Sequence, residues 1–203
     1  MLSIGEVFTL FFITLGPMKL LGPFAQQTRN LDSAALRAMA WRVFLIGTVA
    51  VLIGGYVGTA LALKWNLSLP ALLIATGIIF FLVAIKVVMA PYSSVHQTTE
   101  PLPEKPMVAA LQLTFPLVVS PYGIAALIAI FAGEGNPGIE KQIYLALLGV
   151  MALNLLSMLF IRNIMRPSVL LVLQIVGAVL GVLQVCLAVQ IILRAFRELH
   201  LLA

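Results

Sequence analysis

The 203-residue chain is 62% hydrophobic and only 9% charged. Because soluble domains carry roughly 25% charged residues, this composition excludes a water-facing surface and indicates an integral membrane protein rather than a soluble enzyme. The formal net charge is +5, but Lys and Arg are scattered along the chain, which excludes a nucleic-acid-binding patch. The single cysteine, Cys186, excludes an intrachain disulfide, and the residue spacing predicts no metal site and no cofactor.

Six apolar segments are near or above the length of about 18 residues that a membrane-spanning helix needs. From the N-terminus they are Val7–Phe24, Val43–Leu63, Leu67–Ala90, Met107–Ala132, Ile143–Ile161 and Val169–Leu193. In hydrocarbon every backbone donor and acceptor must be paired internally, so these runs are expected to be helices. The first lacks the basic start and the cleavage motif of a signal peptide and is expected to be retained. The sequence therefore predicts an all-α, polytopic membrane protein with six transmembrane helices in a single domain, residues 1–203.

Polar loops separate these segments. The first expected loop is Gln26–Arg42, and the second is the short Lys64-Trp65-Asn66 turn. Residues 91–106 contain four prolines, which is typical of a linker. Gly133–Gln142 and Arg162–Pro167 complete the set.

The distribution of basic residues predicts the orientation, because cytoplasmic loops carry an excess of Lys and Arg. The odd-numbered loops hold six bases, whereas the even-numbered loops and the C-terminus hold four. The six are Arg29, Arg37, Arg42, Lys105, Arg162 and Arg166, and the four are Lys64, Lys141, Arg194 and Arg197. We therefore expect the odd loops in the cytoplasm and both termini outside.

The linker divides the spans into three and three, residues 1–90 and 107–203. With an odd number of spans in each half, the second half must enter the membrane inverted, a common plan among transporters. At an offset of 104 residues, Gly16-Pro17 aligns with Ser120-Pro121. Two identities in the third and sixth helices share that offset: Gly77 with Gly181, and Ala84 with Ala188. An inverted 3+3 repeat is the prediction.

Proline-glycine pairs interrupt the first and fourth helices, in TLGPMKLLGPF (Thr14 to Phe24) and FPLVVSPYGI (Phe115 to Ile124). Proline removes a backbone donor and clashes with the carbonyl four residues back, so each site predicts a kink or a break. Their matching positions in the two halves favour broken helices that line a cavity. A break exposes N–H groups at the start of the second half-helix, and these attract anions such as a carboxylate.

These segments resemble the MarC family of bacterial membrane proteins, which includes SnatA-type neutral amino acid transporters. The similar pieces are FFITLGPMKLLGPF, GIIFFLVAIKVV, LTFPLVVSPYGIAAL and GVLQVCLAVQIIL, in the family's order. The resemblance implies a six-helix protein of the inner (plasma) membrane, some of whose relatives import glycine or alanine. The family's first motif usually reads Asp-Pro-x-Gly-Asn. Here Gly16 replaces the Asp, Pro17 remains, and Lys19-Leu20 replace Gly-Asn, while Ser120 replaces a Gly in the fourth helix. These changes make the site more positive.

The candidate substrate-binding residues lie at the two breaks. They are Thr14, Gly16, Pro17, Lys19, Ser120, Pro121 and Gly123. An ammonium in mid-membrane costs about 2.5–3.5 kcal/mol on insertion scales, so Lys19 either snorkels to the interface or pairs with an anionic substrate group. The hydroxyls of Thr14 and Ser120 either bind substrate or cap freed carbonyls. Lys86 is expected to snorkel, while its alignment with Gln190 leaves a role in the cavity as the alternative. Asn154 is expected to make interhelical hydrogen bonds.

Together these features predict a transporter of small solutes, such as amino acids or related carboxylate metabolites, that works by alternating access. Its expected partners are the lipid bilayer and an anionic or zwitterionic small molecule, and an oligomer is left open. No Asp or Glu lies within a span, so an acid-based proton relay is not expected. One alternative is a non-transporting scaffold or regulatory protein. Another is an intramembrane enzyme, but the spans offer no His or acid for catalysis.

Overall fold

The computed structural model describes residues 4–89, 106–115, 118–133, 137–165 and 167–199. Within these ranges the chain forms helices and turns and contains no strand. The helices are α1 (Ile4–Leu15), α2 (Met18–Gln27), α3 (Ser33–Lys64), α4 (Leu69–Met89), α5 (Pro106–Thr114), α6 (Pro121–Gly133), α7 (Pro137–Leu159), α8 (Ile161–Ile164) and α9 (Pro167–Glu198). The all-α prediction is confirmed for these ranges. Of the predicted linker, 91–106, only Pro106 belongs to the described residues.

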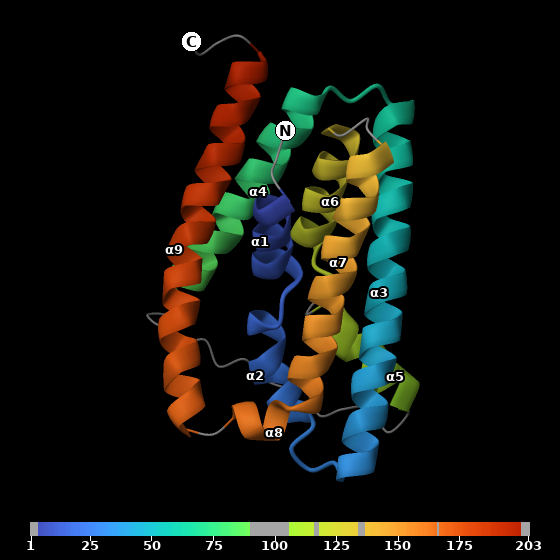
Figure 1. Ribbon diagram of the computed structural model, residues 1–203, viewed down its shortest axis with the longest axis vertical. Coiled ribbons are helices and arrows are strands. Elements are labelled where there is room, and N and C mark those ends of the chain that lie inside the picture. The colour runs from blue at the N-terminus through green and yellow to red at the C-terminus, as the bar shows by residue number, and fades with distance from the viewer. Residues whose placement is uncertain (1–3, 90–105, 116–117, 134–136, 166, 200–203) are drawn as a thin grey trace.

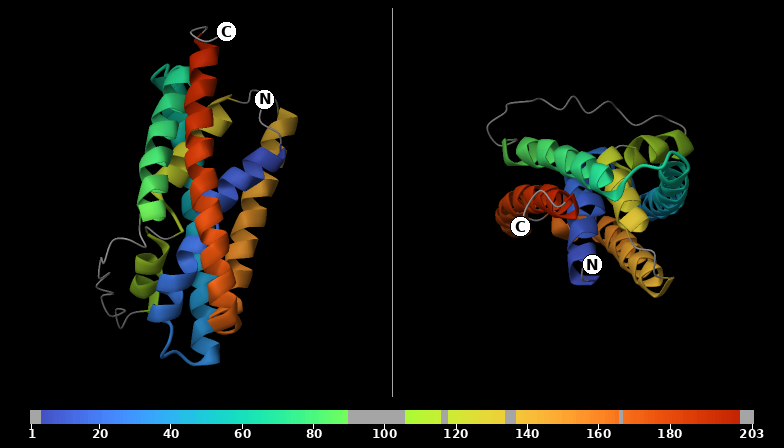
Figure 2. Two further views of the ribbon diagram at one scale, coloured as in Figure 1. Left: turned by 90° about the vertical axis from the view of Figure 1, so that its left-hand side faces the viewer. Right: turned by 90° about the horizontal axis from the view of Figure 1, so that it is seen from above.

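The helices run alternately up and down the long axis of the molecule (Figure 1). α1 and α2 descend in succession, α3 rises, α4 descends obliquely, α5 and α6 rise, α7 descends and α9 rises. The start of α1 and the end of α9 lie in the same half of the molecule. Viewed from above, α1 lies between α9 and α7, with α3 and α9 on opposite sides (Figure 2).

Four helical segments are long and apolar enough to cross a membrane. They are Val7–Gln27, Ser33–Lys64, Glu140–Leu159 and Ala178–Glu198, and Leu69–Ile85 of α4 is a shorter apolar helix. The predicted fourth span appears as two shorter helices, α5 and α6. Among the described residues, therefore, four of the six predicted segments are long enough to span a membrane.

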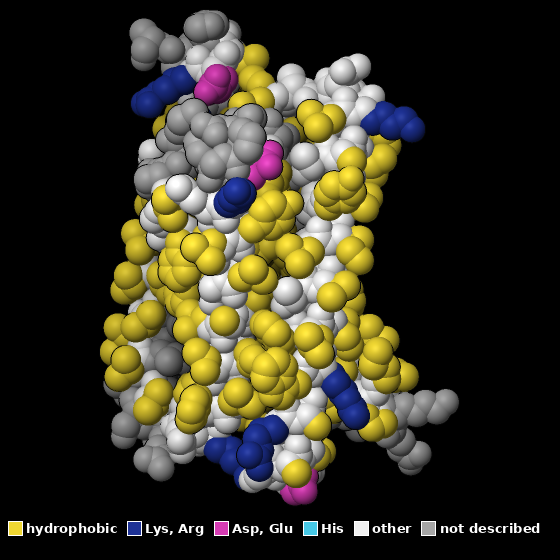
Figure 3. Space-filling view, turned by 45° about the vertical axis from the view of Figure 1, so that its right-hand side comes forward, with side chains coloured by type: hydrophobic (Ala, Val, Ile, Leu, Met, Phe, Trp, Pro, Cys, Tyr) yellow, Lys and Arg dark blue, Asp and Glu magenta, His cyan; other side chains and the backbone are white. Residues whose placement is uncertain are grey.

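Large apolar side chains cover the outer surface of the long helices. On α3 and α9 the exposed ones include Leu45, Val49, Ile53, Val57, Val172, Ile175, Val179 and Val182. Lys, Arg, Asp and Glu lie toward the two ends of the face in Figure 3, and hydrophobic side chains fill its middle. Water would disfavour such a surface, whereas lipid tails accept it.

The predicted first loop, Gln26–Arg42, is wrong, because the chain is helical on both sides of a shorter connection, Thr28–Asp32. Asp32 caps the start of α3: its side chain accepts a hydrogen bond from the Ala35 N–H at 2.8 Å. The cap allows α3 to begin in polar sequence, before the apolar run. Similarly, the predicted loop Arg162–Pro167 begins within a short helix, α8.

The predicted turn at Lys64-Trp65-Asn66 is confirmed and ends α3 with a Schellman motif. Asn66 has a φ of 51°, a left-handed conformation that Asn tolerates better than most residues. Its N–H donates to the Leu63 carbonyl at 3.1 Å, and the Leu67 N–H donates to the Ala62 carbonyl at 2.9 Å. These bonds satisfy the last carbonyls of α3 and turn the chain into α4.

Small residues bring α4 and α9 together. A Cβ atom on Gly77 would lie 2.4 Å from Ile192 Cγ1 and 3.1 Å from the Ala188 carbonyl oxygen. Ala84 and Ala188 are fully buried. Since lipid supplies no hydrophobic drive for helix association, such close approach lets van der Waals packing hold the two helices together.

We predict that Gly77→Ala destabilises the protein by roughly 1–3 kcal/mol, because the added methyl group overpacks the contact between α4 and α9. Gly5→Ala is the matched control, since a Cβ there meets nothing within 4 Å. The unfolding temperature of each variant in detergent is the measurement. Equal unfolding temperatures for the two variants would contradict this account of the contact.

Candidate functional site

The first break separates α1 from α2 at Gly16 and Pro17, as expected from the sequence. Pro17 has no N–H to continue the bonding of α1. Its carbonyl instead starts α2, by accepting hydrogen bonds from the N–H groups of Leu20 at 2.9 Å and Leu21 at 3.1 Å. A Cβ on Gly16 would lie 1.8 Å from the Phe12 carbonyl oxygen. The bend therefore requires glycine at this position unless the backbone shifts.

The second break lies between Thr114, the end of α5, and Pro121, the start of α6. The Thr114 carbonyl accepts hydrogen bonds from the N–H groups of Val118 at 2.9 Å and Val119 at 3.0 Å. Ser120 caps α6, because its hydroxyl oxygen accepts a hydrogen bond from the Gly123 N–H at 3.3 Å. Proline at the first helical position costs no hydrogen bond there. Both ends of this break are thus satisfied locally.

The two breaks meet in the interior. The Ser120 hydroxyl donates to the Thr14 carbonyl, 3.4 Å away near the end of α1. Gly123 permits this approach, since a Cβ there would lie 2.3 Å from Leu15 Cδ2. Thr14 and Ser120 are both buried. One hydroxyl therefore caps α6 and also binds the end of α1.

Asn154 of α7 completes the junction, a role beyond the interhelical hydrogen bonding that its sequence position predicts. Its Nδ2 donates to the Leu15 carbonyl at 2.6 Å, so a second carbonyl freed by the break gains a partner. Its Oδ1 is buried, and no hydrogen-bond partner for it lies among the described residues. The only signal for this role in the sequence was a polar amide within a largely apolar segment.

The predicted site residues divide into three groups. Thr14, Gly16, Pro17, Ser120 and Gly123 are buried and lie around the junction. Pro121 begins α6 but is exposed, so it sets backbone geometry and does not face the junction. Lys19 belongs to the first turn of α2, and its side chain, like that of Lys86, lies outside the described residues.

The two broken helices differ electrostatically at this junction. A helix carries a partial positive charge at its start and a partial negative charge at its end. α1 presents its carbonyl end here, and α2 begins one residue beyond Pro17, with no side-chain cap. The first N–H groups of a helix have no acceptor within it. The start of α2 therefore differs from that of α6, where Ser120 fills this role.

An all-helical, multi-pass membrane protein with two interrupted helices in contact is the class that these features define. A family model for MarC family integral membrane proteins matches residues 1–200. The chain belongs to the MarC family, as its motifs predicted. No curated protein and no solved structure gives a significant match.

We predict that Asn154→Ala lowers stability by about 0.6–1.7 kcal/mol, the range for interhelical hydrogen bonds in membranes. The Leu15 carbonyl would lose the donor that Asn154 supplies. Asn163→Ala is the control, because Asn163 is exposed in α8. Thermal unfolding in detergent compares the two variants, and an Asn154 variant as stable as its control would refute the role of this bond.

Proposed function

We propose that this protein transports small solutes that carry a carboxylate, amino acids above all, and that it is not an enzyme. The observation that carries the proposal is the junction of the two broken helices through Ser120 and Thr14. Interrupted helices that meet in the membrane provide helix ends of both signs where substrates bind in transporters.

In this proposal the substrate carboxylate lies at the uncapped start of α2. Unpaired N–H groups and the dipole there favour an anion, and Lys19, in the same turn, adds a full positive charge. The Oδ1 of Asn154, which has no partner among the described residues, offers an acceptor for an ammonium group, and the end of α1 adds its partial negative charge. An amino acid carries both groups, and this match is our reason for favouring it.

We further propose that the chain is an inverted 3+3 repeat of six spans. In that scheme α1–α2 corresponds to α5–α6, α3 to α7, and α4 to α9. Packing supports the scheme, because α1 packs on α7 as α5 packs on α3, while α3 pairs with α7 and α4 with α9. The alignment of the two breaks and the closeness of Gly77 to Ala188 agree with it.

The same scheme suggests alternating access, because equivalent contacts differ between the two halves: α6 packs more extensively on α3 and α4 than α2 packs on α7 and α9. α4 packs against α6, and the Thr76 hydroxyl donates to the Ala125 carbonyl at 3.4 Å. The equivalent contact, α9 on α2, is not among the main helix contacts within the described ranges. We propose that the α4–α6 contact is one closed gate, and that it opens when α9 closes on α2.

We propose that the protein is oriented with both termini outside the cytoplasm, because the odd-numbered loops hold more Lys and Arg residues than the even-numbered loops and the C-terminus. Arg29 and Arg162 line one cavity between α2, α3 and α8, so two of the six bases lie at one end of the molecule. A C-terminal reporter that is active only in the cytoplasm should stay silent in intact cells. A strong signal would reverse the orientation.

We predict that Lys19→Met abolishes solute uptake while expression and folding are retained, because the charge that holds the carboxylate is lost. Lys86→Met is the matched control and should have a mild effect. Purified protein in liposomes is tested with a panel of radiolabelled amino acids and carboxylic acids, alanine first. Normal uptake by the Lys19 variant refutes its role, and a wild type that neither transports nor binds any member of the panel favours a scaffold.

We predict that a short cross-link between α4 and α6 stops uptake. Cysteines replace Thr76 and Ala125 in a Cys186→Ala background, since Cys186 is exposed and would react. A bifunctional thiosulfonate reagent joins them, and a reducing agent should restore transport. Each single-cysteine variant is a control. Undiminished uptake by fully cross-linked protein would show that this contact is not a gate.

A further inference from the structure

A cavity of about 460 Å³ lies where the end of α2, the start of α3 and the short helix α8 meet. Arg29 and Arg162 both line it, together with the polar side chains of Gln26 and Thr28. None of the described residues that line it is acidic. The cavity therefore has two positive charges and no carboxylate of its own to balance them.

Arg162 is held in position by neutral partners. One terminal nitrogen, Nη1, donates to the Ser33 hydroxyl at 2.9 Å, and Nη2 donates to the Leu31 carbonyl at 2.6 Å. A guanidinium has five N–H donors in a fixed plane, so these bonds orient the group and leave donors for a ligand. Both acceptors are neutral, so these bonds do not compensate its charge, and no ion pair of Arg162 is found among the described residues.

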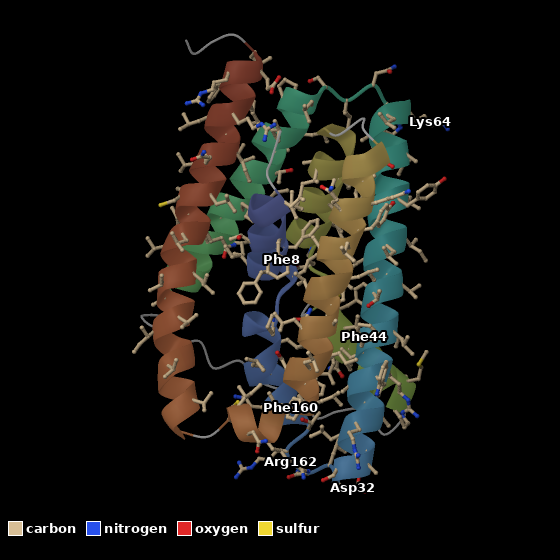
Figure 4. All side chains as sticks on the ribbon, in the orientation of Figure 1. Phe8, Asp32, Phe44, Lys64, Phe160 and Arg162 are labelled. Atoms are coloured by element: carbon tan, nitrogen blue, oxygen red, sulfur yellow. The ribbon has the colours of Figure 1, made fainter. Side chains whose placement is uncertain are left out.

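The position and the lining of the cavity indicate which kind of ligand it would bind. Arg162 and Asp32 lie at the same end of the molecule (Figure 4), and on the face seen in Figure 3 the charged side chains gather toward the ends, away from the apolar middle. Asp32 does not line the cavity, and its Oδ1 is occupied by the Ala35 N–H. Leu36, Ile161 and Met165 supply apolar walls. Paired guanidiniums favour phosphate through bidentate hydrogen bonds, and the apolar walls suit the glycerol and chain beside a headgroup.

We propose that the Arg29–Arg162 cavity binds a phosphate group, either the headgroup of an anionic phospholipid or a free phosphate. Basic pockets between helices at the cytoplasmic surface bind anionic headgroups in this way. A bound phosphate would link α8 to the connection between α2 and α3. This site does not depend on the proposed transport function, which concerns the junction of the breaks.

The test measures binding to full-length purified protein. Native mass spectrometry and unfolding temperatures are recorded with phosphatidylglycerol, with phosphatidylcholine and with inorganic phosphate. The variant Arg29→Gln/Arg162→Gln is compared with Arg194→Gln/Arg197→Gln, which removes the same charge from the end of α9. We expect phosphatidylglycerol, phosphate or both to stabilise the wild type and the α9 control. Binding to the cavity variant should be weaker by roughly tenfold or more, as loss of charged hydrogen bonds implies.

The results with the three ligands show whether the bound phosphate belongs to a lipid headgroup or is free, and the variants show whether it binds in this cavity. Stabilisation by phosphatidylglycerol alone assigns a lipid headgroup, and stabilisation by inorganic phosphate assigns a free phosphate. An equal loss of affinity in both double variants would mean general charge attraction and would overturn the site. A wild type that binds neither phosphatidylglycerol nor phosphate would also overturn it. If the double variant does not fold, Arg29→Gln is compared with Arg197→Gln, because the hydrogen bonds that hold α8 to the start of α3 come from Arg162. Equal affinities of these two would also overturn the site.

Discussion

The carbonyl groups freed at the end of α1 need hydrogen-bond donors, and this need constrains much of the structure. In an apolar interior an unpaired backbone group costs several kcal/mol. The donors come from elements distant in sequence: the Ser120 hydroxyl for Thr14 and the Asn154 amide for Leu15. A broken helix in the first part of the chain is therefore stable only when the start of α6 and the middle of α7 lie against it.

Glycine has a specific task at this junction. Gly16 leaves no space for a side chain beside the Phe12 carbonyl, and Gly123 leaves none beside Leu15. One glycine permits the bend in α1, and the other permits α6 to approach it. Both are needed because the Ser120 hydroxyl is only 3.4 Å from the Thr14 carbonyl, a separation that a side chain between the helices would increase.

The sequence predicted the features that depend on local chemistry. Hydropathy located the apolar helices, proline and glycine located both breaks, and Asn66 marked the end of α3. The sequence did not predict the start of α3. An apolar run marks only the part of a helix that contacts lipid, whereas the cap at Asp32 extends α3 into polar sequence. Asn154 was missed as a junction residue because its partner is 139 positions away. The Arg29–Arg162 cavity was missed for the same reason, since its lining comes from both halves of the chain.

The two breaks are alike in position but unlike in how their helix ends are satisfied. At the second break, local N–H groups occupy the Thr114 carbonyl and Ser120 caps α6. At the first, the carbonyls rely on other helices, and the start of α2 has no side-chain cap. A helix start that already has a side-chain cap gains less from a ligand, whereas an uncapped start gains a partner from an anion. In the proposed inverted repeat this difference would divide the work of the two halves: α6 holds the junction together, and α2 retains backbone donors for the proposed substrate.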